Sequence, residues 1–249
     1  MKVIVNADDF GFSKGANLGV AEACQNGLVR SATMMANMPG FVHGVEVARQ
    51  NPDLKIGVHL NLTAGRSLGG RYKTLTDDRG SFLSLAEVES RAKAGLLDPE
   101  EVEAEYEAQI GRVLAAGIPP THFDGHHHTQ NLPGIVGVFL KLAKKYGVGV
   151  RISDKSLLAG RYASLKTTAH FSGDFYGERA TAENLKAVIS GCSGASLEIM
   201  SHPAYLDYPL LSQSSYNTGR CAELDILTKG ELADFIRKNN HHICSFADL

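Results

Sequence analysis

Ionisable side chains follow short apolar runs at several widely separated points of this 249-residue sequence. Two adjacent carboxylates, Asp8 and Asp9, come after KVIVNA, and His59 stands within GVHLNL. Three consecutive histidines occupy positions 126–128, and His202 follows the run LEIMS. Carboxylates and imidazoles can bind divalent metal ions, and imidazole also transfers protons near neutral pH. These residue types predict a metal-assisted hydrolytic centre, provided that the fold brings them together.

The segment VNADDFG puts two carboxylates at the end of a predicted strand. Successive side chains of a strand point to opposite sides, so one of the two carboxylates can bind a metal ion while the other faces the reacting molecule. Aspartate and glycine are also ordinary turn formers, and the motif by itself is more typical of a structural turn. It gains meaning only from the histidines that accompany it.

The histidines would supply nitrogen ligands. His59 lies in an apolar run where both ring nitrogens need partners, and metal ligation with a second hydrogen bond provides them, although a hydrogen-bonded core histidine is the simpler alternative. Gly125 permits a sharp turn, and an extended chain after it would point His126 and His128 to the same side. One aspartate and two histidines from three strands would leave open coordination positions on Zn, Mn, Co or Mg.

Two further residues could assist the chemistry. His202 is followed by Pro203, which holds the chain extended, and a histidine beside a metal site can protonate a leaving group. A capping or core histidine is the alternative. Arg151 lies in the short run GVRIS, where a buried cation needs a carboxylate partner. Asp8 is a fitting partner for Arg151, and an ordinary salt bridge elsewhere is equally compatible with the sequence.

The elements that must position these residues alternate between strand and helix. The apolar runs predict strands over 2–7, 28–37, 55–62, 121–125, 149–152, 196–201 and 241–246. Helical spacing predicts helices over 14–26, 41–50, 84–95, 99–116, 133–146, 181–190 and 229–238. This alternation indicates an α/β fold with a parallel sheet, either an open doubly wound sheet or a (β/α) barrel. Because five strand ends carry ionisable groups, we expect one (β/α) barrel, TIM-barrel-like and complete or incomplete, as a single catalytic domain over 1–249.

Two longer stretches, 65–81 and 203–220, carry no regular pattern. Each directly follows a polar strand end, so we expect them to border the cavity as substrate loops. Ordinary surface loops are the alternative.

The composition argues against several other classes of protein. The net charge is −2, and the scattered lysines and arginines form no basic stripe for nucleic acid. The four cysteines contain no C-x-x-C pair, which predicts reduced thiols. The N-terminal apolar run is too short for a signal peptide, and no eighteen apolar residues run together. We therefore expect a cytoplasmic protein without membrane contact.

The motifs VNADDFG, GVHLNLT, THFDGHHH and SHPAY, in this order, resemble the YdjC-like carbohydrate deacetylases, a family that includes chitooligosaccharide deacetylases. The resemblance spans residues 3 to about 245. It implies a (β/α)-barrel-like fold and metal-dependent removal of an acetyl group from an N-acetylated sugar. It also implies one divalent ion, Mg²⁺ or Zn²⁺, on Asp9, His59 and His126, with Asp8 as the general base and His202 as the acid.

The wider NodB-type deacetylases take both metal histidines from one H-x-x-x-H segment. The residue four positions after His59 is Thr63, so that arrangement is absent and the third ligand must come from the triplet. By the resemblance that ligand is His126, and His128 is the alternative.

The resemblance implies a short chito-oligosaccharide, phosphorylated or not, as the substrate. Arg151 is expected to assist catalysis. Substrate contacts are expected from four residues: Phe10, Asn61, His128 and Tyr205. A metal-dependent phosphoesterase or amidohydrolase is an alternative, because positions 126–128 also match an H-x-H pattern. A non-catalytic sugar-binding barrel is another. No charge run points to a protein partner, and a homodimer is compatible with the sequence.

Overall fold

The computed structural model describes residues 1–249, and these form two compact units. Unit 1 comprises Met1–Met34, Pro39–Ile56 and Thr168–Leu249, and unit 2 comprises Met35–Met38 and Gly57–Thr167. Both units combine parallel strands with helices. The α/β class of (β/α)-barrel type that the sequence predicts is therefore confirmed, whereas a single catalytic domain over 1–249 stays a prediction.

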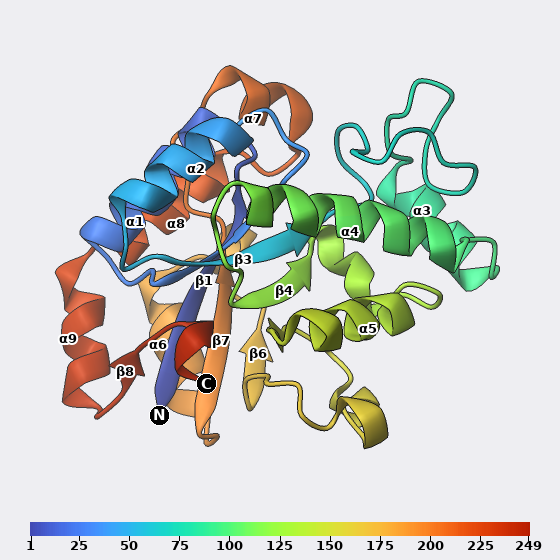
Figure 1. The fold of residues 1–249 in the computed structure, drawn as a ribbon. Helices are drawn as coiled ribbons and strands as arrows, with labels where there is room; N and C mark the ends of the chain where they lie inside the picture. Colours follow the sequence, from blue (N-terminus) through green and yellow to red (C-terminus); the bar gives the residue numbers. More distant parts are fainter. The chain divides into compact units, whose positions relative to one another are not determined.

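In unit 1 the strand order is β2-β1-β7-β6, and β8 also pairs with β1 (Figure 1). All of these pairings are parallel. The strands are β1 (Lys2–Phe10), β2 (Ser31–Met34), β6 (His170–Ser172), β7 (Ser196–Ser201) and β8 (His242–Ile243). The helices are α1 (Lys14–Gln25), α2 (Phe41–Gln50), α6 (Ala182–Gly191), α7 (Tyr208–Gln213), α8 (Thr218–Leu227) and α9 (Gly230–Lys238).

The register of β1 and β7 decides which polar residues of unit 1 come together. The two strands pair residue by residue up to Ala7 and Ser201. Asp8 and His202, which follow these two residues, therefore lie at the same edge of the sheet. β1 is buried from Val3 onward, as expected for a parallel strand whose two faces are both covered.

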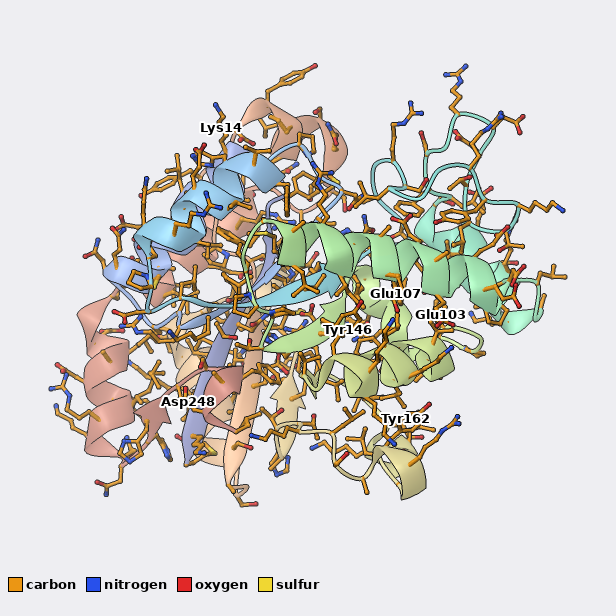
Figure 2. All side chains as sticks on the ribbon, in the orientation of Figure 1. Lys14, Glu103, Glu107, Tyr146, Tyr162 and Asp248 are labelled. Atoms are coloured by element: carbon orange, nitrogen blue, oxygen red, sulfur yellow. The ribbon has the colours of Figure 1, made fainter.

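In unit 2 the strand order is β3-β4-β5, again with parallel pairing. Its elements are β3 (Lys55–Leu60, of which Gly57–Leu60 lie in this unit), β4 (His122–Gly125), β5 (Gly149–Val150), α3 (Leu85–Lys93), α4 (Pro99–Ala115) and α5 (Val136–Tyr146). The register of β3 and β4 places His59 beside Asp124. Glu103 and Glu107 on α4 form ion pairs with lysines of α5, 2.7 and 2.6 Å apart (Figure 2).

The predicted elements agree with the structure except at three places. The seven predicted helices and seven predicted strands are all present, with ends shifted by a few residues and with β2 and β8 much shorter than predicted. The prediction is wrong in omitting β6, α7 and α8. The stretch 203–220 is consequently not a single irregular loop, because it contains α7 and the beginning of α8.

No helix combines the length and the apolar character needed to cross a bilayer. All four cysteines are free thiols, as the sequence predicts.

Candidate active site

The end of β1 is irregular, and this irregularity changes how its two carboxylates are presented. The pairing register of β1 with β2 shifts between Ala7 and Phe10, which is a β-bulge. Within the bulge Asp9 has φ of +61°, a left-handed conformation that is uncommon for a residue with a side chain. Bulges re-aim side chains at strand ends. The left-handed φ of Asp9 interrupts the regular strand geometry assumed for Asp8 and Asp9, and the division of roles between these two carboxylates stays a prediction.

Asp9 forms a buried ion pair with Arg220 of α8. The guanidinium Nη2 lies 2.7 Å from Asp9 Oδ2, and the two side chains are 2% and 4% exposed. Arg220 Nε also donates to the carbonyl of Tyr216 at 2.8 Å. Removing one member of such a buried pair typically costs about 3–5 kcal/mol, because the remaining charge is left without compensation. Arg220 is therefore needed to keep an ionised Asp9 in this place.

Asp8 is held by neighbours on the strands. Asn6 Nδ2 donates to Asp8 Oδ1 at 2.9 Å and also to the hydroxyl of Thr33 at 3.1 Å. Asn6 and Asp8 are both buried. Hydrogen bonding to a carboxylate favours its ionised form and restricts its rotation. Asp8 is thus a buried carboxylate with a defined orientation.

His202 lies against Glu223, a fully buried carboxylate on α8. The backbone N–H of His202 donates to Glu223 Oε2, and His202 Nδ1 lies 3.7 Å from Glu223 Oε1. The phenol of Tyr216 donates to the same Oε1 at 2.6 Å. Glu223 therefore contacts both the backbone and the ring of His202. This arrangement places the imidazole beside a buried carboxylate.

In unit 2, His59, Asp124 and Arg151 form a buried chain of contacts. His59 Nδ1 lies 2.7 Å from Asp124 Oδ1, and Arg151 Nη1 lies 2.9 Å from Asp124 Oδ2. All three side chains are at most 2% exposed. A carboxylate that accepts from one ring nitrogen fixes the tautomer of the histidine and presents the other nitrogen as a ligand. The carboxylate partner of Arg151 in this unit is Asp124.

The histidine triplet is not extended. Residues His126–Asn131 form short 3-10 turns interrupted by a kink, at which His127 and His128 have left-handed φ values of +55° and +56°. The expectation that His126 and His128 point to one side of an extended chain is therefore wrong. The imidazole of His126 is buried and meets that of His59 edge-on, with ring centroids 5.4 Å apart.

Gly125, the last residue of β4, is extended with φ of −150°, so the sharp turn expected at this glycine is wrong, and the chain turns at His127 and His128 instead. A Cβ atom on Gly125 would lie 2.5 Å from Gln130 Oε1, so a larger residue would require the Gln130 side chain to move. His127 is exposed, and its Nδ1 lies 2.9 Å from the Thr63 hydroxyl. Of the three rings, only that of His126 is buried.

The four expected substrate-contact residues have different surroundings. Phe10 is fully buried, so its ring offers no exposed face to a sugar. Asn61 uses its amide group within the protein, donating to Asn37 Oδ1 and accepting from backbone N–H groups of the following turn. His128 is partly exposed. Tyr205 is 48% exposed, and its backbone N–H donates to the carbonyl of Gly15.

Sequence reasoning missed the roles of Asp124, Arg220 and Glu223. Asp124 stands two residues before the first histidine of the triplet, and the strand register that pairs it with His59 was the missing information. Arg220 and Glu223 lie three positions apart on one face of α8, the helix that the sequence did not predict. The two charged residues are three positions apart, and Leu224 and Leu227 follow them. This spacing is the signal that could have revealed a helix with a buried polar face.

The active sites of (β/α) folds lie at the carboxyl ends of the parallel strands, which is where these carboxylate–histidine contacts are found. A family model described as YdjC-like protein matches residues 2–238. The chain belongs to the YdjC-like family.

Several curated proteins resemble the chain over its whole length. A carbohydrate deacetylase of Brevibacillus brevis is 42% identical, and one of Clostridium beijerinckii is 38% identical, each over 100% of both chains. Carbohydrate deacetylase 1 of Listeria innocua is 42% identical, again over 100% of both chains. The resemblance to carbohydrate deacetylases seen in the motifs is confirmed by these relatives.

Solved structures show the same fold. A crystal structure from Enterococcus faecalis V583, described as a candidate cellobiose-phosphate cleavage protein, aligns with a TM-score of 0.91 and 30% identity, covering 99% of this chain and 98% of that chain. A family 4 carbohydrate esterase from Streptomyces lividans, in complex with acetate, aligns with a TM-score of 0.53 and 15% identity over 98% of this chain and 91% of that one. The second likeness concerns the fold alone.

Proposed function

We propose that this protein is a metal-dependent carbohydrate N-deacetylase that releases acetate from a short N-acetylated sugar, such as a chito-oligosaccharide. The observation that carries the proposal is the pair of buried carboxylate–imidazole contacts, Asp124 with His59 and Glu223 with His202, in a chain of the YdjC-like family. The curated relatives named carbohydrate deacetylase support the reaction and the class of substrate.

The residues proposed to hold the metal ion are Asp9, His59 and His126, and all three are buried. The donor set fits a divalent ion of the zinc, manganese or magnesium type, since it contains oxygen and nitrogen without sulfur. The Asp124 carboxylate at His59 Nδ1 is the support that metal-ligating histidines usually have. When bound, the ion would polarise the acetamide carbonyl and make water more acidic.

The protein's own residues would move the protons. Asp8, oriented by Asn6, would take one proton from the water that attacks the acetamide carbon. The C–N bond then breaks, and His202, oriented by Glu223, would donate a proton to the departing amine nitrogen. Water and the acetamide are thus converted to acetate and a free amino sugar. Arg151 would act through Asp124, by holding the carboxylate that orients His59.

Acetate release is the direct test. We expect the protein to release acetate from di-N-acetylchitobiose, and a chelator to abolish the release. Release of inorganic phosphate from a phosphorylated disaccharide instead would favour the phosphoesterase alternative, an assay motivated by the description of the Enterococcus faecalis structure. Sugar binding with neither product would favour the non-catalytic alternative.

A substitution of the proposed base sharpens this test. Asp8→Asn keeps the shape of the side chain and its contact with Asn6 but cannot accept the proton. We expect kcat to fall by about 10²- to 10⁴-fold, with the metal content unchanged in elemental analysis. Full activity of Asp8→Asn would show that another group is the base.

A further inference from the structure

Two tyrosine rings stack beside His202 in unit 1. Tyr176 precedes the 3-10 turn Gly177–Arg179, and Tyr216 lies between α7 and α8. Their ring centroids are 4.0 Å apart with an interplanar angle of 26°. Both rings meet the imidazole of His202 edge-on, with centroids 5.4 and 5.7 Å away. An aromatic pair therefore adjoins the proposed acid directly.

The inner ring of this pair is held rigidly. The Tyr216 hydroxyl donates to Glu223 Oε1 at 2.6 Å and accepts from the backbone N–H of Gly177 at 3.0 Å. Burial, with the nearby Glu223 carboxylate adding to it, raises the pKa of Tyr216 well above its ordinary value, so the phenol keeps its proton at neutral pH. Because Glu223 also accepts from the N–H of His202, one carboxylate fixes both the tyrosine and the histidine.

The outer ring is available to a ligand. Tyr176 remains 43% exposed although Tyr216 covers one of its faces. Tyr176 therefore keeps apolar aromatic surface that a ligand can contact. The chain has no tryptophan, so tyrosine and phenylalanine supply all of its large flat aromatic surfaces. Of the two aromatic residues that the sequence suggested as substrate contacts, Phe10 is fully buried and Tyr205 is 48% exposed.

We propose that Tyr176, backed by Tyr216, is a binding platform for a pyranose ring of the substrate. An uncharged sugar ring would place its C–H face on the exposed surface of Tyr176, next to His202. The identity of the sugar rests on the proposed deacetylase function. Its role is to hold the sugar near the proton donor, and it does not take part in bond breaking.

The kinetic test uses four variants with di-N-acetylchitobiose. Tyr176→Ala should raise KM about 5- to 10-fold and leave kcat within about 2-fold, the loss expected for one stacking contact. Tyr176→Phe and Tyr176→Trp keep a ring and should keep KM near the wild-type value. Tyr162→Ala removes a tyrosine that contacts Arg161 in another 3-10 turn and serves as the matched control. A fall in kcat without a change in KM would overturn the platform and indicate that Tyr176 merely supports His202.

A binding measurement separates this proposal from the proposed function. Calorimetric titration of Asp8→Asn with the disaccharide needs no turnover, and adding Tyr176→Ala should weaken Kd about 5- to 10-fold. If the wild-type protein releases no acetate but this loss of affinity is found, the deacetylase assignment fails and the platform stands. If acetate is released and Tyr176→Ala changes neither KM nor Kd, the platform fails alone. Absence of any binding also overturns the platform for this sugar.

Discussion

Glu223 on α8 forms polar contacts with both His202 and Tyr216. It is fully buried and accepts from the backbone of His202 and from the phenol of Tyr216. A buried carboxylate is costly unless it is well hydrogen bonded, and these contacts provide the compensation. The hydrogen bonds from the His202 backbone and from Tyr216 fix the Glu223 carboxylate. This fixed carboxylate also contacts the imidazole of His202. Glu223 is accordingly a positioning residue.

Replacing Glu223 should reduce turnover rather than binding. In Glu223→Gln the amide nitrogen would face donors that need an acceptor, and the orientation of His202 would relax. We expect kcat to fall about 10- to 100-fold with KM changed by less than about 3-fold, the reverse of the Tyr176→Ala pattern. Glu223→Asp retains the charge and should recover part of kcat. Wild-type kcat in folded Glu223→Gln, checked by circular dichroism, would contradict this role.

At the scale of elements, α4 anchors the loop 65–81 through two glutamates one turn apart. Glu105 is fully buried and accepts from the backbone N–H groups of Leu68 and Gly69. Glu101 accepts from the N–H of Lys73 and from both the N–H and the hydroxyl of Thr74. Burial raises the pKa of Glu105. The first half of the loop is therefore tied to a helix at residues 68–69 and 73–74, although its sequence carries no regular pattern.

The Glu101 contacts predict a pH-dependent contribution to stability. Burial raises the pKa of Glu101, but the hydrogen bonds from Thr74 and Lys73 outweigh it, so the pKa lies below its ordinary value of 4.5. A carboxyl group with a lowered folded-state pKa stabilises the protein above the unfolded pKa, and this stabilisation is lost as the pH falls through the folded value.

Glu101→Gln should therefore lower the free energy of unfolding by about 1 kcal/mol at pH 7, a modest value because the group is largely solvent-screened. The difference from wild type should shrink as the pH drops below 4.5. Urea denaturation at pH 7 and at about pH 3.5 measures both values. A difference that stays constant across this range would show that ionised Glu101 does not hold the loop.

At the scale of the whole molecule, metal binding should stabilise the folded chain. A ligand that binds only the folded state stabilises it by about 2.7 kcal/mol at a hundred times its Kd. For a chain of 249 residues we expect Zn²⁺ or Mg²⁺ to raise Tm by about 5–10 °C, and a chelator to reverse the increase. His59→Ala should show no increase, because it removes a proposed ligand. An equal increase in wild type and His59→Ala would place the ion elsewhere.

Other whole-molecule expectations stay predictions. These are the cytoplasmic location, the homodimer, the absence of nucleic acid and membrane partners, and a single domain over 1–249.

The sequence predicts much of the fold because helix and strand patterns are local. The helix 41–50 coincides with α2, and Asp98 before Pro99 begins α4 as a capping residue should. β6 was missed because it is only three residues long and incompletely buried. α8 was missed because its buried face includes Arg220 and Glu223, whereas amphipathic patterns are recognised from apolar residues.

The candidate site, like the fold, has features that the sequence predicts and features that it does not. Residue types and motif order are enough to indicate Asp8, Asp9, His59, His126 and His202. The conformations at two of these places could not be read from the motifs. The irregularity at Asp9 belongs to the pairing of β1 with β2, and the left-handed conformations at 127–128 interrupt the chain directly after β4.

By itself, the sequence determined the kinds of chemical group available and the alternation of strands and helices, since both are written in short stretches of chain. Only the tertiary structure decided which charge compensates which. Asp124 meets His59 across 65 positions, Glu223 meets His202 across 21, and Arg220 meets Asp9 across 211. A buried charge is stabilised by whichever opposite charge or donor the strand register and helix packing bring within about 3 Å, and separation along the chain does not reveal that partner.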